Sequence, residues 1–181
     1  FLDDAVSYRI ILKNSAGVTQ FDKDRIASLG STQVQSFNSI AALRLRSGTT
    51  TANAAKTLGY YAAGDGGGNT FYWDSTSVAT DNGGTVIKPT SVSGAGRWLA
   101  VDTSCVSLKQ CGAKGDGSNC DDAWAVFCNL EGDGVIEPGT YGITKHVTIS
   151  SGVLKTIRGI GNPTISITLP IDTNFLTCNR Q

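Results

Sequence analysis

The chain has 181 residues, of which 40% are hydrophobic and 17% are charged, and its formal net charge is zero. The length suits one large domain or two to three small ones with ordinary hydrophobic cores, and 22 glycines against four prolines indicate short strands joined by tight turns. Zero net charge gives no electrostatic reason to expect nucleic acid as a partner, and the lack of an apolar run of ~20 residues or a signal-peptide pattern argues against membrane insertion.

The first region, residues 1–30, contains an alternating strand, a turn and a return strand. The apolar residues on one face of the first strand are Val6, Tyr8, Ile10 and Leu12. The turn spans residues 14–17, and the return strand spans residues 18–21. This hairpin predicts the end of an N-terminal anchoring β-domain.

The second region, residues 31–103, predicts a small β-rich module with one short helix. A polar capping residue and a short apolar periodicity in residues 36–43 suit one or two helical turns. Glycine-containing turns separate the strand-like runs that follow, which are residues 57–61, 70–73, 85–88 and 97–101.

A glycine-rich segment lies between the first two of these runs, at residues 64–69. Neither Lys-Ser nor Lys-Thr follows it, no helix opens behind it, and Asn69 breaks a GxGxxG pattern, so it does not predict a phosphate site. We expect Gly66 and Gly67 to take positive φ values in a tight turn.

Four aromatic residues of this region are candidate contacts. Strand alternation places Phe71 and Trp73 on the face opposite Tyr72, so one set is expected in the core and the other at the surface. Tyr72, Trp73 and Trp98 are candidates for subunit or sugar contacts. Core packing or a subunit contact is the favoured role of these aromatic residues, and stacking on carbohydrate is the alternative.

The third region, residues 104–181, begins with a strand near Val106, and then Gly112, Gly115 and Gly117 are expected to let the chain turn sharply. Asp121 and Asp122 are predicted to begin a helix over residues 121–129. Their carboxylates suit hydrogen bonding to the N–H groups of its first turn and oppose the helix dipole. Short strand runs follow at residues 147–149, 153–157 and 164–169.

No catalytic or metal site is predicted. The capping role accounts for Asp121 and Asp122, whose adjacent positions do not suit paired acid and base groups. The single histidine, His146, has no neighbouring nucleophile or acid cluster and is expected at the surface. Five irregularly spaced cysteines form no zinc pattern and are expected as thiols in a protein made in a reducing cytoplasm.

Two stretches resemble known families. Residues 106–143, including Gly112-Ala113-Lys114-Gly115-Asp116-Gly117 and Pro138-Gly139-Thr140-Tyr141, resemble the opening of the right-handed parallel β-helix of the pectate-lyase-like superfamily. Residues 58–98 resemble a module that precedes the β-helix in bacteriophage tailspikes. The segments that carry this resemblance are Leu58 to Asp74, Asp81 to Ile87 and Gly96 to Trp98. Cys111 and Cys120 depart from the sequence pattern of the β-helix family.

The resemblance implies a mainly β chain in three parts. These are the end of an anchoring β-domain in residues 1–30, a tailspike neck module in residues 31–103, and the N-terminal cap and first rungs of a β-helix in residues 104–181. Residues 121–129 would be the cap, because an open first rung exposes apolar interior and unpaired backbone groups. Since the chain lacks methionine and shows no closing cap, it is expected to be a segment of a longer polypeptide.

The implied function is that of the virion anchor and neck of a homotrimeric tailspike, made in the host cytoplasm and assembled into the virion tail. Its expected partners are two further copies, a tail, baseplate or sister-tailspike protein, and a host surface polysaccharide, capsule or O-antigen, bound and depolymerised by the downstream β-helix. No cofactor is expected. The alternatives are a fragment of a secreted pectate-lyase-like lyase or hydrolase, and a structural adhesin without enzymatic activity.

Overall fold

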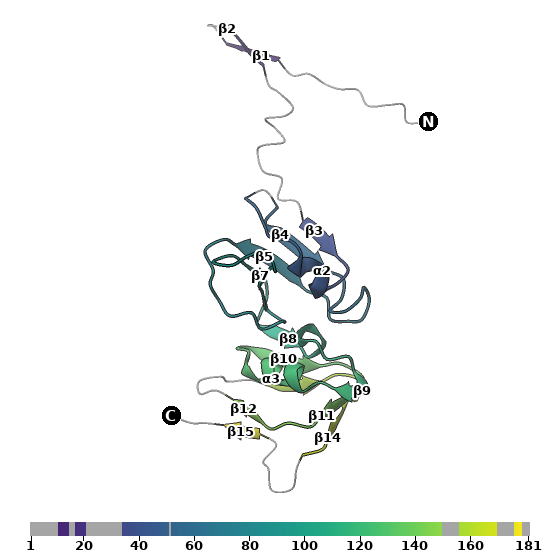
Figure 1. The fold of residues 1–181 in the computed structure, drawn as a ribbon. Helices are drawn as coiled ribbons and strands as arrows, with labels where there is room; N and C mark the ends of the chain where they lie inside the picture. Colours follow the sequence, from purple (N-terminus) through teal and green to yellow (C-terminus); the bar gives the residue numbers. More distant parts are fainter. Residues whose placement is uncertain are drawn as a thin grey trace, which may run out of the picture. The chain divides into compact units, whose positions relative to one another are not determined.

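The computed structural model describes residues 11–14, 17–20, 34–50, 52–149, 156–169 and 176–178 (Figure 1). The chain divides into two compact units, Phe1–Thr32 and Gln33–Gln181. In the first unit, strands β1 (Ile11–Asn14) and β2 (Gly17–Gln20) pair antiparallel, with Asn14 opposite Gly17. This pairing confirms the predicted hairpin, while the remainder of its predicted strands lies outside the described residues.

The second unit opens with a five-stranded sheet and a short helix. Its elements are β3 (Val34–Phe37), α2 (Ile40–Arg44), β4 (Ala54–Thr57), β5 (Thr70–Asp74), β6 (Val86–Ile87) and β7 (Arg97–Ala100). The strand order is β3-β4-β5-β7-β6, in which only β3 and β4 run parallel to each other. We call residues 34–103 the sheet domain.

The core of the sheet domain lies on one face of the sheet, where α2 packs against β3 and β4. Ser39 begins the helix because its side chain accepts a hydrogen bond from the Ala42 N–H at 3.2 Å. The buried core residues are Ile40, Leu43, Ala55, Phe71, Ile87, Trp98 and Ala100. The predicted short helix is therefore present, with its apolar side toward the sheet.

Three predicted strands of the sheet domain are found at β5, β6 and β7, but the first is displaced. The sequence favoured residues 57–61, whereas β4 spans Ala54–Thr57. The aromatic pair Tyr60 and Tyr61 has strong strand propensity. Their backbone N–H groups instead bind the Asp65 carboxylate, so the segment turns away from the sheet.

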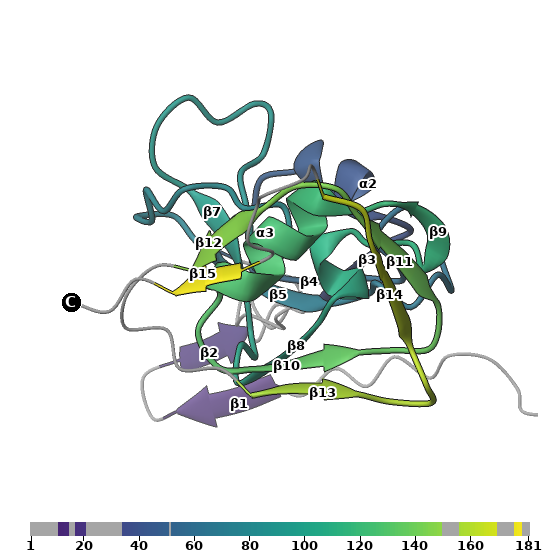
Figure 2. The same ribbon diagram turned by 90° about the horizontal axis from the view of Figure 1, so that it is seen from below.

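The remainder of the described chain winds into a three-sided coil of parallel strands. Its elements are β8 (Cys105–Ser107), η1 (Lys109–Cys111), β9 (Asp116–Asn119), α3 (Asp121–Asn129), β10 (Asp133–Ile136), β11 (Thr140–Ile143), β12 (Val147–Ile149), β13 (Ile157–Gly159), β14 (Thr164–Ile167) and β15 (Leu176–Cys178). The three parallel sheets have the orders β13-β10-β8, β14-β11-β9 and β12-β15. Figure 2 shows them as the sides of a triangle.

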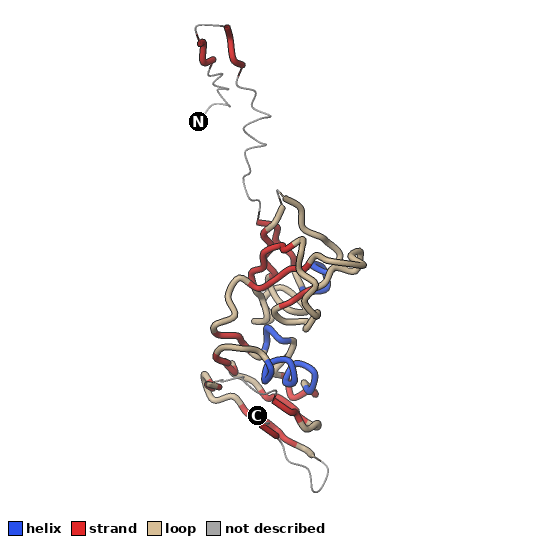
Figure 3. The backbone as a smooth tube through the Cα atoms, turned by 90° about the vertical axis from the view of Figure 1, so that its left-hand side faces the viewer, coloured by secondary structure: helices blue, strands red, loops and turns tan. Residues whose placement is uncertain are grey.

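Helix α3 closes one end of this coil. It lies between the five-stranded sheet and the later coil strands (Figure 3). Trp124 and Phe127 stack with ring centroids 5.7 Å apart. They join a buried cluster that includes Val106, Tyr141 and Ile143 from the coil strands. The predicted helix over residues 121–129 is confirmed to the residue, and its apolar side fills the coil interior.

The turn predicted through Gly112, Gly115 and Gly117 is more ordered than a simple turn. It contains η1 and strand β9, which pairs with β11 through an irregular register. Gly117 lies within β9 at φ +88°, and a positive φ at a register shift is typical of a β-bulge. The polar residues of β9 are all exposed, so no apolar alternation signals this strand.

We expect Phe127→Ala to lower the free energy of unfolding by about 3–5 kcal/mol, because the ring is fully buried and its removal leaves a cavity beneath α3. Urea denaturation monitored by circular dichroism measures the change. Val78→Ala, at a residue that is 73% exposed, is the control and should change stability by less than ~0.5 kcal/mol. Equal losses in the two variants would contradict the packing described here.

Candidate functional site: the junction of sheet and coil

The loop after β4 is organised by one carboxylate. Asp65 accepts hydrogen bonds from four backbone N–H groups, at 2.9 Å from Tyr60, 2.7 Å from Tyr61, 3.0 Å from Ala62 and 2.8 Å from Gly67. Burial alone would raise the pKa of Asp65, but these four donors lower it below the usual value. The loop is thereby held in the shape that presents both tyrosines to the coil.

Three polar contacts join the sheet domain to the coil. The Tyr61 hydroxyl donates to the Gly112 carbonyl at 2.7 Å, and the Gln110 side-chain amide donates to the Gly68 carbonyl at 3.1 Å. The Lys114 ammonium lies 5.1 Å from the centroid of the Tyr61 ring, within cation–π range. Each contact connects the loop after β4 to the segment around η1.

Glycines bring the two backbones close together at this junction. A Cβ on Gly67 would lie 2.6 Å from the Lys109 carbonyl oxygen, and one on Gly112 would lie 2.8 Å from the Tyr60 ring. Gly66 and Gly112 have the positive φ expected for turn glycines, at +88° and +104°. Gly67 does not, so the positive φ predicted for it is wrong, and its need for glycine is steric.

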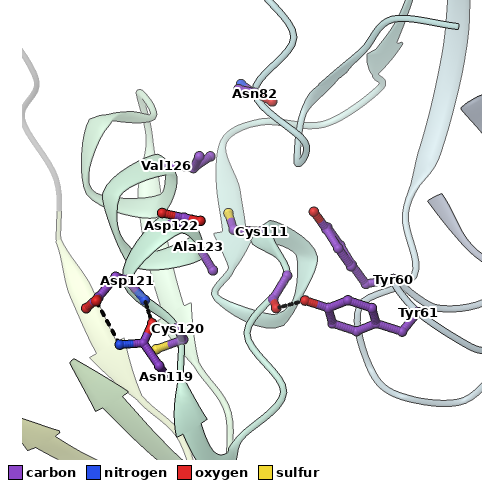
Figure 4. Close-up of a pocket in the computed structure, with 11 residues that line it drawn as sticks. Tyr60, Tyr61, Asn82, Cys111, Asn119, Cys120, Asp121, Asp122, Ala123 and Val126 are labelled. Atoms are coloured by element: carbon purple, nitrogen blue, oxygen red, sulfur yellow. Dashed lines mark hydrogen bonds between the residues drawn. The ribbon is translucent and has the colours of Figure 1, made fainter. Parts of the chain in front are cut away.

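A pocket of about 260 Å³ lies in the same junction (Figure 4). Tyr60, Tyr61 and Asn82 line it from the sheet domain, and Asp122 and Val126 line it from α3. Cys111, Cys120 and Asp121 also line it. The pocket is therefore enclosed jointly by the two parts of the second unit.

Asp121 does not make the predicted capping hydrogen bonds. The N-cap of α3 is Cys120, and the Asp121 carboxylate reaches across to β11's C-terminal end, where it accepts from the Thr144 N–H at 2.7 Å, the Thr144 hydroxyl at 2.6 Å and the Lys145 N–H at 3.0 Å. The Asn119 amide also donates to it at 2.7 Å. Asp122 is exposed in the same first turn, where its negative charge interacts favourably with the positive end of the helix dipole.

The pKa values around Asp121 describe a structural carboxylate and an inert thiol. Burial opposes ionisation of Asp121, but the hydrogen bonds from Thr144, Asn119 and Lys145 lower its pKa to about 2. Burial, reinforced by the Asp121 charge, raises the pKa of the Cys120 thiol to about 11. A carboxylate this acidic is a weak base, so the pair suits fixing α3 rather than proton transfer.

The predicted aromatic contacts divide between core and surface. Phe71 and Trp98 are fully buried, and the Trp98 indole N–H donates to the Arg46 carbonyl at 2.8 Å. Trp98 offers no surface, so its prediction as a subunit or sugar contact is wrong. Trp73 is half-buried, and its ring centroid lies 5.2 Å from that of Trp98, whereas Tyr72 is 44% exposed. The predicted separation of Tyr72 from Phe71 and Trp73 is confirmed.

The sequence reasoning missed an ion pair that shapes the sheet domain. Arg44 at the end of α2 pairs with Asp81, with Nη2 2.8 Å from Oδ1, and the Asp81 carboxylate also accepts from the Gly83 and Lys88 N–H groups at 2.9 Å each. The Asn82 side chain accepts from three following N–H groups. The sequence feature that could have indicated this ion pair is Asp81-Asn82-Gly83-Gly84. It favours a turn, and the Asp81 carboxylate in it can pair with a cation from a distant part of the chain.

Other predicted site features have simple positions. His146 is exposed, as expected. Cys105 is an exposed thiol, whereas Cys111, Cys120 and Cys128 are buried. Among the described residues no cluster of three or more histidine, cysteine or acidic side chains suits a metal ion. Over that same part of the chain, no helix is both long enough and apolar enough to span a bilayer.

The sheet domain matches a known protein family. Residues 36–103 fit the family described as the phage tail protein small four-stranded beta-sheet domain. This part of the chain is therefore similar to a phage tail protein domain. The match begins within β3 and includes all of β4 to β7, which is the antiparallel part of the sheet plus its junction with β3. This family supports a place in the virion tail. No significantly similar sequence is found among curated proteins.

Solved structures similar to the chain extend the likeness into the coil. A tailspike protein of Acinetobacter baumannii bacteriophage Fri1, described as a capsular polysaccharide depolymerase, is 26% identical with a TM-score of 0.57, over 71% of this chain and 23% of that one. The tailspike of Acinetobacter phage vB_ApiP_P1 is 24% identical with a TM-score of 0.59, over 81% of this chain and 26% of that one.

A bacterial enzyme shares the fold. Pantoea stewartii WceF, a glycan biofilm modifying enzyme with a tailspike-like parallel β-helix, is 18% identical with a TM-score of 0.51, over 72% of this chain and 22% of that one. The chain thus spans about a quarter of the length of these proteins. The described chain is mainly β with short helices, and its three parallel sheets form the sides of one coil. This arrangement agrees with the beginning of the parallel β-helix in these proteins.

We expect Asp121 to account for about 2 kcal/mol of the fall in the free energy of unfolding as the pH drops from about 4 to about 2, because its pKa is lower in the folded chain, about 2, than its ordinary 3.8. The contribution is fully present above the unfolded pKa and is lost as the carboxylate protonates in the folded state. Urea titrations across this range should show the loss, and Asp121→Asn should remove it. Asp122→Asn is the exposed neighbouring control, and an equal flattening there would refute the assignment.

Gly112→Ala should destabilise the chain more than Gly117→Ala. Both glycines have positive φ, which costs alanine about 1 kcal/mol, but only a Cβ on Gly112 meets the Tyr60 ring, whereas the space around Gly117 is open. The two midpoints of thermal unfolding give the comparison. The difference isolates the close approach at the junction, and equal destabilisation would show that backbone conformation alone accounts for both.

Proposed function

We propose that the chain is the virion-anchoring and neck part of a homotrimeric phage tailspike. The observation that supports this most strongly is the order of its parts, a phage tail protein sheet domain followed directly by a coil of parallel strands. The contacts of Tyr61 and Gln110 and the close glycine packing make this sequence of parts a continuous mechanical connection. Its work is to transmit position and force.

The division of labour proposed for the chain has three parts. Residues 1–30 belong to the end of the anchoring β-domain, residues 31–103 form the neck, and residues 104–181 begin a right-handed parallel β-helix. Helix α3 is the N-terminal cap, because Trp124 and Phe127 cover the interior that the first rung would otherwise expose to water. Asp121 fixes the cap through Thr144 and Lys145.

The downstream β-helix is proposed to bind and depolymerise a host surface polysaccharide. The support is the likeness to the Fri1 tailspike, itself described as a capsular polysaccharide depolymerase. This chain is proposed to be the non-catalytic part, since the junction's acid is engaged by structural donors. Its other proposed partner is a tail, baseplate or sister-tailspike protein, met after synthesis in the host cytoplasm.

The likeness to the Pantoea enzyme keeps a bacterial glycan-modifying enzyme as the second candidate. The two candidates differ in the role proposed for residues 36–103, whose match to a phage tail protein family favours assembly into a tail. A structural adhesin without enzyme shares the same neck and differs only in the activity of the complete protein.

The first experiment is the solution mass of the chain by light scattering behind size exclusion. We expect three times the chain mass of 18.9 kDa, because a neck must hold three coils in register. The control is the same measurement after dilution, which separates a stable trimer from weak association. A monomer at every concentration would count against the neck proposal and favour the secreted-enzyme candidate.

A further inference from the structure

The outward face of the five-stranded sheet carries an apolar row that crosses all five strands. The strand registers place Val34 opposite Ala54, Ala54 opposite Tyr72, Tyr72 opposite Leu99, and Leu99 opposite Val86. Neighbouring strands lie about 4.8 Å apart, so the row is about 19 Å long. We call these five residues the outer row.

The outer row is not part of the core. The core residues Ala55, Phe71 and Trp98 point to the opposite face, which α2 covers. Val34 is 59% exposed and Tyr72 is 44% exposed, and the other three members are half-buried. A continuous apolar row of this kind on a free sheet face is typical of an interaction surface, because single exposed apolar residues do not line up across five strands.

Opposite charges flank the row. Lys56 lies two residues beyond Ala54 on β4, and Asp74 lies two residues beyond Tyr72 on β5, which runs in the opposite direction. The two charges therefore stand on opposite sides of the row. Asp74 Oδ1 accepts from Thr76 and Ser77, and Arg97, opposite Asp74 in the register, donates to backbone carbonyls, so the Asp74 carboxylate presents Oδ2 to a neighbour. Two copies of this face, turned relative to each other, bring Lys56 of one copy toward Asp74 of the next, as cyclic assembly requires.

We propose that the outer row is the contact surface between copies of this chain, with Tyr72 as its central anchor. This proposal rests on the homotrimer proposed above and names the face through which the neck associates. The occupant is a second copy because the face supplies both halves of a charge pair, and because the formal net charge of zero leaves the copies without mutual repulsion. A Tyr at the centre of an apolar row also has the composition of an interface hot spot.

The test is the effect of Tyr72→Glu on self-association, measured by sedimentation equilibrium of the full chain. We expect the association constant to fall at least tenfold, because the variant places a charge in a desolvated contact. Leu45→Glu is the matched control. Leu45 is 70% exposed at the end of α2, on the other side of the sheet, so its variant should associate like the original chain.

A charge reversal tests the choice of a second copy. Lys56→Asp and Asp74→Lys should each weaken association several-fold, and the double variant should recover much of the loss. Thermal unfolding of each variant checks that the sheet domain remains folded. A double variant no tighter than the single variants overturns the pairing.

The outcomes separate this proposal from the trimer itself. An original chain that associates, with an undiminished association constant in Tyr72→Glu, overturns the assigned face and leaves the trimer standing. An original chain that never associates overturns both.

Discussion

Closure of the coil interior by α3 is the constraint on which the second unit depends. Each described coil strand contributes at most two buried residues to the interior, so a single turn of coil buries too little apolar surface to hold itself together. Trp124 and Phe127 supply two large rings at the end where no earlier turn exists. The buried Asp121 then fixes the helix to the segment after β11. Apolar burial and one saturated carboxylate thus act on the same nine-residue helix.

The junction between the coil and the sheet domain also depends on a small number of contacts. The two buried clusters on either side of it are separate, so the orientation of one part against the other comes from backbone packing and directed hydrogen bonds. Glycine at positions 67 and 112 permits the approach, and Asp65 holds the loop that supplies Tyr61. Such contacts are short-ranged and directional, which suits a connection that must resist bending more than it must bind a ligand.

Local sequence determined some of these features, and distant contacts determined the rest. Helix α3 was predictable because acids precede a short apolar periodicity, and β5 and β7 were predictable from their aromatic and apolar alternation. Strand β9 was not, because Asp116 to Asn119 are polar and pair only when β11 is beside them. The role of Asp121 was also hidden, since its partners Thr144 and Lys145 lie more than twenty residues away. A carboxylate next to a helix start has two satisfactory geometries, and only the fold selects one.

Strand alternation connects the buried core of the sheet domain to its outer row. The period of two that buries Phe71 necessarily turns Tyr72 outward, and the pairing that aligns Phe71 with Ala55 and Ala100 also aligns Tyr72 with Ala54 and Leu99. A shift of one residue would exchange the two faces and place Lys56 in the core. The register that stabilises the monomer therefore also determines which side chains any neighbouring molecule meets, so stability and assembly are specified by the same set of strand pairs.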